Sequence, residues 1–220
     1  MRYFPNGSAI ELRRLIQLAW PMLLAQSAQT AMSLSDTLMA SWAGPDQLAA
    51  IALGSSIWTP LSLSLAGLMM ALTPIVAHHV GGDREQETPI ELFNNMWIAL
   101  IIGLLSWLFI NGSSESILTW LSVEPQLAAI SVDYLFAISW GIPGMLLYQS
   151  VRAFAEGHGQ TRVVMKIGIS AVVVNIPLNY VLIFGELGFP KMGGVGCGWA
   201  TTISFWYMFF AGIVYLKFSR

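Results

Sequence analysis

One acidic side chain, Asp36, lies inside the first long apolar stretch of the sequence, among leucine and methionine residues. A carboxylate near the centre of a lipid bilayer costs about 2.5–3.5 kcal/mol on insertion scales, so it normally faces a cavity or a partner. Gln26, Gln29 and Ser33 precede Asp36 at steps of three, four and three residues, which places all four on one helix face. We expect this face to line a substrate cavity; the alternative is a hydrogen-bonded seam between helices.

A second polar group stands in a later apolar stretch, in the run NIPLN at 175–179. Its amides, Asn175 and Asn179, are four residues apart and therefore share a helix face. Pro177 lacks a backbone N–H and frees a carbonyl, which favours a bent helix that lines a cavity. The alternative is a purely structural proline kink, in which the neighbouring amides only satisfy the freed backbone group. Thr201 and the threonine after it add hydroxyls, and such carboxylate, amide and hydroxyl oxygens suit a hard cation such as sodium.

No motif of a soluble enzyme accompanies these groups. The sequence has no Walker A loop, so an ATP-driven pump is unsupported. The single cysteine, Cys197, excludes an internal disulfide and a cysteine-based metal cluster. His78 and His79 are adjacent and do not share a helix face, so a metal pair is not expected. The net charge of −2 indicates no nucleic-acid partner. We therefore predict a protein that is not an enzyme and holds no cofactor and no metal.

Composition and the length of the apolar stretches indicate an integral membrane protein. Of the 220 residues, 55% are hydrophobic and 10% are charged, whereas a soluble domain has about 25% charged residues. A helix needs about 20 mostly apolar residues to cross roughly 30 Å of hydrocarbon. Six stretches qualify and predict an all-α fold of six transmembrane helices in one domain, 1–220, with one of the loops opening at Asn111. The stretches are residues 15–42, 48–77, 92–110, 127–151, 163–184 and 199–216.

The distribution of basic residues predicts the orientation in the membrane. With the amino terminus in the cytoplasm, nine of the ten Lys and Arg residues fall on the cytoplasmic side, and Lys191 alone falls outside. An excess of Lys and Arg is typical of cytoplasmic loops. We therefore expect a multi-pass protein of the cell membrane with both termini in the cytoplasm.

Several short motifs, in a fixed order, resemble one family of transporters over nearly the whole sequence. They are WP at 20–21 with Gln26 and Asp36 after it, LAAIALG at 48–54, RAFAEGHGQT at 152–161, NIPLNY at 175–180 and GVGCGWATT at 194–202. In their order and spacing these motifs resemble the amino-terminal half of a multidrug and toxic compound extrusion (MATE) transporter of the NorM type.

The resemblance implies export of amphipathic, often cationic drugs in exchange for protons or sodium ions, from a bacterial inner membrane. It also implies twelve spans in two six-helix lobes around a central cleft, so the expected partners are the lipid bilayer, the drugs and a second six-helix half. That half belongs either to the same longer chain or to another subunit. The family's membrane acid matches Asp36, and its polar site matches Asn175, Asn179 and Thr201. Some members have an aspartate where this chain has Asn179.

Two other functions stay open at this stage. A lipid-linked oligosaccharide flippase of the same superfamily normally needs basic cavity residues for phosphates, and the middle of the spans offers none. A membrane assembly subunit without transport of its own would need Asp36 only for folding or pairing. For the transporter, we expect Asp36 to bind the coupling ion and the drug in turn.

Overall fold

The computed structural model describes residues 8–218, except the side chains of residues 8–11 and 14, and this part of the chain is helical with no strand. Eight α-helices and a short 3-10 helix follow one another. They are α1 (Ser8–Ala43), α2 (Pro45–Met70), α3 (Leu72–Gly81), η1 (Glu85–Glu87), α4 (Thr88–Trp120), α5 (Pro125–Ser139), α6 (Ile142–Gly157), α7 (Thr161–Phe184) and α8 (Gly194–Phe218).

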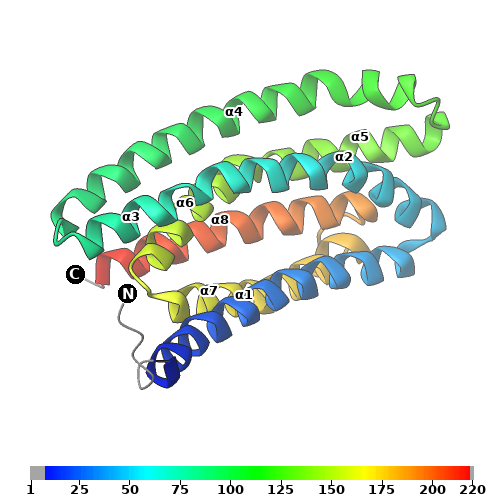
Figure 1. The fold of residues 1–220 in the computed structure, drawn as a ribbon. Helices are drawn as coiled ribbons and strands as arrows, with labels where there is room; N and C mark the ends of the chain where they lie inside the picture. The colour runs from blue at the N-terminus through cyan, green and yellow to red at the C-terminus, as the bar shows by residue number, and fades with distance from the viewer. Residues whose placement is uncertain (1–7, 219–220) are drawn as a thin grey trace.

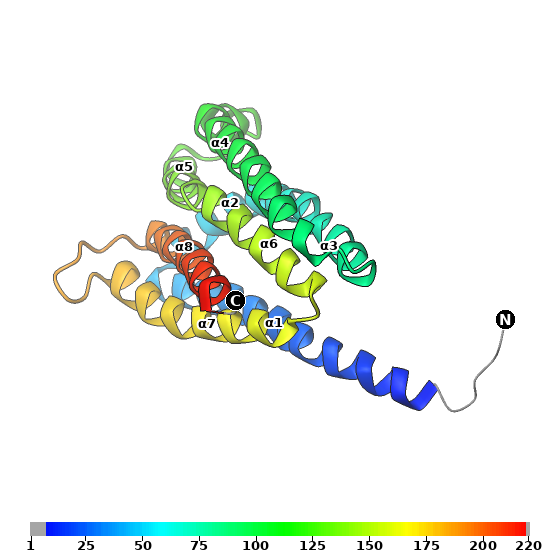
Figure 2. The ribbon, with the colours of Figure 1, turned by 90° about the vertical axis from the view of Figure 1, so that its left-hand side faces the viewer.

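The helices lie side by side in an elongated bundle (Figure 1). The pairs α1–α7 and α4–α5 lie at opposite edges, with α2, α6 and α8 between them, as the view along the bundle shows (Figure 2). The first turn of α1 and the last turn of α8 lie at the same end of the bundle. An even number of crossings requires this arrangement.

Each of the six predicted spans lies in one helix or in two consecutive helices. The second span is α2 followed by α3, and the fourth is α5 followed by α6, with a bend of 42° between them. Four segments of the described chain are long and apolar enough to cross a membrane, and the bent pair makes a fifth; the four are Pro45–Gly81, Glu85–Trp120, Thr161–Phe184 and Gly194–Phe218. The sixth, α1, falls outside this set because polar residues interrupt its apolar sequence.

One predicted loop is wrong. The sequence predicts that the third span ends near residue 110 and that a loop opens at Asn111, but α4 continues as a helix to Trp120. The Asn111 amide explains the difference, because its Nδ2 donates to the Trp107 carbonyl at 2.7 Å and to the Ser139 hydroxyl at 3.0 Å. The side chain therefore bonds within α4 and to α5, and does not favour a turn here.

Two glycines set the ends of helices. Gly44 is the one residue between α1 and α2, and its φ of 138° is a value that side chains other than glycine rarely adopt. Pro45 then begins α2 with the fixed φ suited to a first helical position. Gly185 ends α7 in the left-handed conformation, with φ 78°, as many helix C-termini do.

The outer face of α4 indicates what surrounds the bundle. Its large apolar side chains at steps of three and four residues are exposed; they are Phe93, Trp97, Ile101, Leu104 and Leu108. A continuous apolar stripe this long is disfavoured in water and suits contact with lipid chains. In contrast, every residue from Gly141 to Ala153 is buried, so α6 is a central helix, against which α2, α3, α4, α7 and α8 pack.

Candidate functional site

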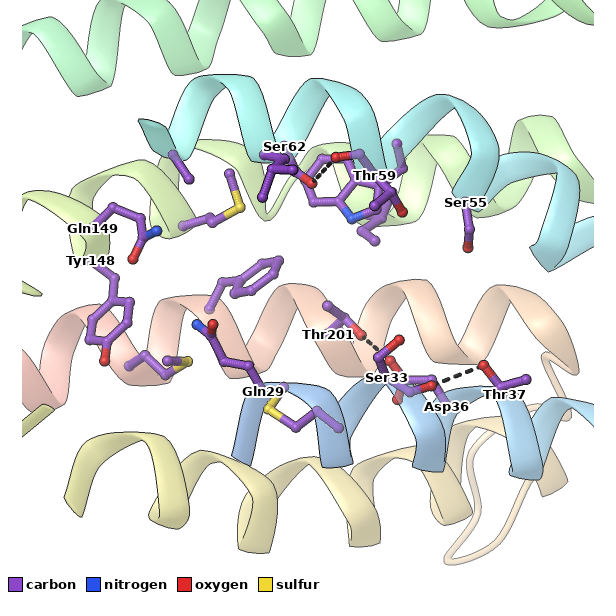
Figure 3. Close-up of a pocket in the computed structure, with 18 of the residues that line it drawn as sticks. Gln29, Ser33, Asp36, Thr37, Ser55, Thr59, Ser62, Tyr148, Gln149 and Thr201 are labelled. Carbon is purple, nitrogen blue, oxygen red and sulfur yellow. Dashed lines mark hydrogen bonds between the residues drawn. The ribbon is translucent and has the colours of Figure 1, made fainter. Parts of the chain in front are cut away.

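The carboxylate of Asp36 is held by side chains of two other helices. Asn179 of α7 donates from Nδ2 to Asp36 Oδ1, and Thr201 of α8 donates from Oγ1 to Asp36 Oδ2 at 3.1 Å. Figure 3 shows the Thr201 bond at one side of a cavity. Both partners donate and both carboxylate oxygens accept, which is the arrangement that suits the ionised form of Asp36.

A second layer of polar side chains supports these contacts from behind. Asn179 Nδ2 also donates to Asn175 Oδ1 at 2.9 Å, and Asn175 Nδ2 donates to the Ser204 hydroxyl at 3.3 Å. Asn175, Asn179 and Ser204 are 0% exposed. The structure therefore brings together Asp36, Asn175, Asn179 and Thr201, the four residues that the sequence analysis assigned to ion coupling. Their part in coupling stays a prediction.

A cavity of about 680 Å³ lies in front of Asp36, between α1, α2, α5, α6 and α8. All four residues of the polar face on α1 line it: Gln26, Gln29, Ser33 and Asp36. Ser55, Thr59 and Ser62 of α2 face them across the cavity, and the wall between is largely apolar. Asp36 also bonds α7 and α8, as the alternative of a hydrogen-bonded seam predicts, so this residue belongs both to a helix contact and to the cavity wall.

The structure differs from two expectations on α7 and α8. Pro177 does not line the cavity; it is exposed, because it lies two residues from both asparagines and thus on the other face of α7. The threonine after Thr201 is turned away as well, since Thr202 Oγ1 donates to the Ala137 carbonyl of α5 at 2.7 Å. Thr201 alone of the two hydroxyls reaches Asp36.

Sequence reasoning missed a basic residue in the cavity wall. Arg152 of α6 lines the cavity, at the end away from Asp36, and its Nε donates to Glu156 Oε1 at 2.8 Å. The two side chains are 10% and 3% exposed, so this ion pair is buried. The spacing of four residues in RAFAE is the signal that could have identified it.

Tyr134 of α5 is a further lining residue that the sequence did not single out. Its hydroxyl lies 3.4 Å from that of Ser55, across the cavity from α1. The ring packs directly on Gly54 of α2, where an added Cβ would lie 2.5 Å from a ring carbon. Gly54 is therefore what lets α5 bring this phenol to the cavity.

The carboxylate, amide and hydroxyl oxygens of Asp36, Asn179 and Thr201 are of the kind that a hard cation prefers. Within residues 8–218 no cluster of three or more His, Cys, Asp or Glu side chains is placed to hold a metal. The Asn179 Oδ1 atom is buried and has no hydrogen-bond partner. For a cation to bind Asp36, the Thr201 hydroxyl must rotate its proton away and the Asn179 amide must turn to present Oδ1.

Comparison with known proteins gives relatives over most of the chain. The family model MatE matches residues 21–181. The probable multidrug resistance protein NorM of Shewanella oneidensis is 41% identical over 213 residues, which cover 97% of this chain and 46% of that protein. The multidrug resistance protein PmpM of Pseudomonas aeruginosa is 45% identical over 200 residues, which cover 90% of this chain and 42% of that protein.

The fold is similar to that of solved transporters. An outward-facing multidrug resistance MATE family transporter of the MOP superfamily superposes with a TM-score of 0.85 at 21% identity, over 94% of this chain and 45% of that one. At this identity the likeness shows the fold alone. The chain thus spans about half the length of the relatives it matches and has the architecture of one six-helix lobe.

Proposed function

The chain belongs to the MatE family of multidrug and toxic compound extrusion (MATE) transporters, and on this premise we propose that it forms one lobe of a secondary active exporter. That exporter moves amphipathic cationic compounds out of the cell in exchange for protons or sodium ions. The relatives named for multidrug resistance support the class of function. The observation that carries the mechanism is the position of Asp36, which faces the cavity while α7 and α8 hold it.

Asp36 supplies the negative charge that a cationic compound needs. It is the one acidic residue among the described residues that line the cavity. Two unit charges 4 Å apart attract each other by about 4 kcal/mol at the effective dielectric constant of a protein surface. A proton or sodium ion on Asp36 cancels this attraction, so ion entry from outside releases the compound. Loss of the ion to the cytoplasm then restores the site.

The amide of Asn179 gives Asp36 a way to hold a proton. A protonated carboxyl group donates one hydrogen bond and needs an acceptor. Asn179 Oδ1 is buried and unpaired on the same amide that now donates to Asp36. Rotation of this amide presents Oδ1 to the new O–H. Asn179 Nδ2 also donates to Asn175 Oδ1, so the Asn175 amide must turn with it to avoid two facing acceptors, and the pair then serves both protonation states.

The polar cavity also supports a second lobe as partner. Gln26, Ser33 and Thr59 line the cavity and are exposed. Unpaired polar groups in hydrocarbon cost several kcal/mol each, which disfavours a cavity that faces lipid. A second six-helix half, in the same longer chain or in another subunit, would cover it and complete a two-lobed cleft. We place this assembly in a bacterial inner membrane with both termini of the lobe in the cytoplasm.

The flippase alternative is less well supported by the cavity. Recognition of a diphosphate needs basic groups that are free to bind it. Arg152 is the one basic residue among the described cavity lining, and its charge is paired with Glu156. The assembly-subunit alternative predicts no transport, so uptake in the following experiment would contradict it and an absence of uptake would support it.

The test uses inverted membrane vesicles that contain this chain together with a carboxyl-terminal half. Uptake of a fluorescent lipophilic cation is measured while a proton gradient and a sodium gradient are imposed separately. We expect uptake with one gradient and not without any. Vesicles with the protein that take up no more cation than empty vesicles under either gradient would exclude the exporter.

A further inference from the structure

Gln149 has a buried side-chain oxygen with nothing to bind. The residue lies on α6 and is 8% exposed, and its Oε1 atom is buried without a hydrogen-bond partner. It lines the cavity, and Figure 3 shows its amide pointing into the space between the helices, at the end away from Asp36. Native structures rarely leave a buried acceptor unpaired, and such an atom calls for an explanation, for example a functional role or a bound water or ion.

Two other amides within the same bundle join neighbouring helices through their N–H groups. Asn95 Nδ2 donates to the Ser150 hydroxyl at 2.9 Å, and Asn111 Nδ2 donates to the Ser139 hydroxyl at 3.0 Å. Gln149 follows Tyr148 and precedes Ser150 on the same helix, and no side chain of a neighbouring helix donates to its Oε1. This atom is covered by its neighbours, so the amide must turn before a compound in the cavity can reach Oε1. The packing of α6 therefore supplies no donor to this acceptor.

The charges around Gln149 restrict what can bind it. Arg152 lies one helical turn further along α6 and also lines the cavity, and its partner Glu156 is bound to it at 2.8 Å. This end of the cavity is thus polar without a free negative charge, while the other end carries Asp36. A second positive charge beside Arg152 is disfavoured, whereas a neutral donor is not.

We propose that Gln149 is a second recognition point for the transported compound, where Oε1 accepts a hydrogen bond from a neutral hydroxyl or amide N–H at the end opposite the compound's positive charge. The inference rests on the proposed export of cations and names a subclass of them. Elongated compounds with a cation at one end and a neutral donor at the other fit both ends of the cavity. Leaving a buried acceptor unpaired is what lets such a site reject a compound that lacks the donor.

The experiment compares two dyes that share the same aromatic core and differ in one terminal group. Both are N-methyl styrylpyridinium cations; one ends in a hydroxymethyl group and the other in its methyl ether, which cannot donate. Export is measured in cells that produce this chain with a carboxyl-terminal half. We expect the hydroxyl dye to be exported about tenfold more efficiently at low concentration, since a hydrogen bond to a buried acceptor has this order of effect.

Gln149→Met removes the acceptor and keeps the length of the side chain. In this variant we expect the ratio of the two export efficiencies to fall close to one, and this ratio is the readout whatever the absolute rate of export. Gln17→Met is the matched control, because Gln17 is exposed on α1 and does not line the cavity; it should keep the full preference. Gln149→Asn withdraws the carbonyl by one methylene and should also reduce the preference for the hydroxyl dye. This variant tests the proposal if Gln149→Met does not reach the membrane.

Two results would overturn the inference, and they are distinguishable. An unchanged preference in Gln149→Met or Gln149→Asn, with both dyes still exported, would mean that only water occupies the acceptor, and the exporter itself would stand. Wild-type protein that exports neither dye would overturn the proposed function and this inference with it.

Discussion

Asn179 of α7 donates a hydrogen bond to Asp36 of α1, across 143 positions of the sequence. The same Nδ2 group donates to Asn175, so one amide joins the cavity acid to the polar layer behind it. Since α1 packs along α7, this bond couples the state of Asp36 to the contact between the two helices. Loss or gain of charge on Asp36 therefore changes the interaction that holds α1 in place.

Asp36→Asn should abolish ion-coupled export while the amount of protein in the membrane stays near normal. The amide has almost the same shape and still accepts a bond, but it cannot carry a negative charge or exchange an ion. Drug accumulation in cells and an immunoblot of the membranes check this. Asp133→Asn is the matched control, because Asp133 is exposed and does not line the cavity. Undiminished efflux in Asp36→Asn would remove this residue from the mechanism.

Among the asparagines, Asn179→Ala should impair export more than Asn175→Ala, and both should impair it less than Asp36→Asn. Asn179 bonds Asp36 directly, whereas loss of Asn175 leaves that bond intact. In Asn175→Ala the Ser204 hydroxyl still donates to the Ala200 carbonyl at 2.8 Å. Rates of dye efflux at equal protein level give the order, with Asn94→Ala on the exposed face of α4 as control. The reverse order of the two asparagines would contradict the network.

How much of this site the sequence could predict depends on the range of the interactions. Spacing within one helix sufficed for the polar face of α1 and for the shared face of Asn175 and Asn179. Spacing within one helix does not predict contacts between helices. The rotation and shift of α8 relative to α1 decide that Thr201, and not Thr202, bonds Asp36. The resemblance to a known family supplied that match, which composition and periodicity could not.

Other residues could not be predicted from the sequence for a different reason. Gln149 lies between Tyr148 and Ser150 without a recognisable motif, and its unpaired oxygen is visible only once the neighbouring helices are in place. Asn111 failed as a loop signal since its amide bonds a carbonyl of its own helix. A polar residue in a membrane span thus indicates a partner, but only the packing identifies which one.

Breaking the buried pair of Arg152 and Glu156 should destabilise the protein. Removing one partner leaves an uncompensated buried charge, which costs about 3–5 kcal/mol, whereas removing both leaves none. We therefore expect Arg152→Met and Glu156→Met each to lower the melting temperature of the detergent-solubilised protein. The double variant should melt above either single one. Arg162→Met, at an exposed position, should melt like wild type. Additive losses in the double variant would mean that the two charges do not interact.

The orientation can be read by cysteine labelling in a background where Cys197 is replaced. Phe189 is exposed in the loop after α7, at one end of the bundle, and Gly112 is exposed within α4, eight residues before the helix ends on that side. Gln86 is exposed in η1 at the other end. An added Cβ at Gly112 meets no atom within 4 Å, so a cysteine is tolerated there. The nine basic residues on one side predict that cysteines at 112 and 189 react with an impermeant thiol reagent outside intact cells. Labelling at position 86 from outside would reverse the orientation.

The chain by itself should not export drugs. Its cavity carries an acid, two glutamines and several hydroxyls on the walls formed by α1 and α2, and in a lone lobe this lining would face lipid, which is strongly disfavoured. The matched relatives are about twice as long, and a second lobe in the same orientation would oppose these residues.

Efflux and oligomer size are therefore to be compared for the 220 residues alone and for the same chain co-expressed with a carboxyl-terminal half. We expect export only in the second case, from a complex of the two halves. Asp36→Asn in that complex should abolish export without separating the halves, because the change removes a charge and leaves the shape of the covered surface. A monomer of this chain that exports the dye unaided would refute the need for a second lobe, since Asp36 would then complete its cycle without an opposing surface.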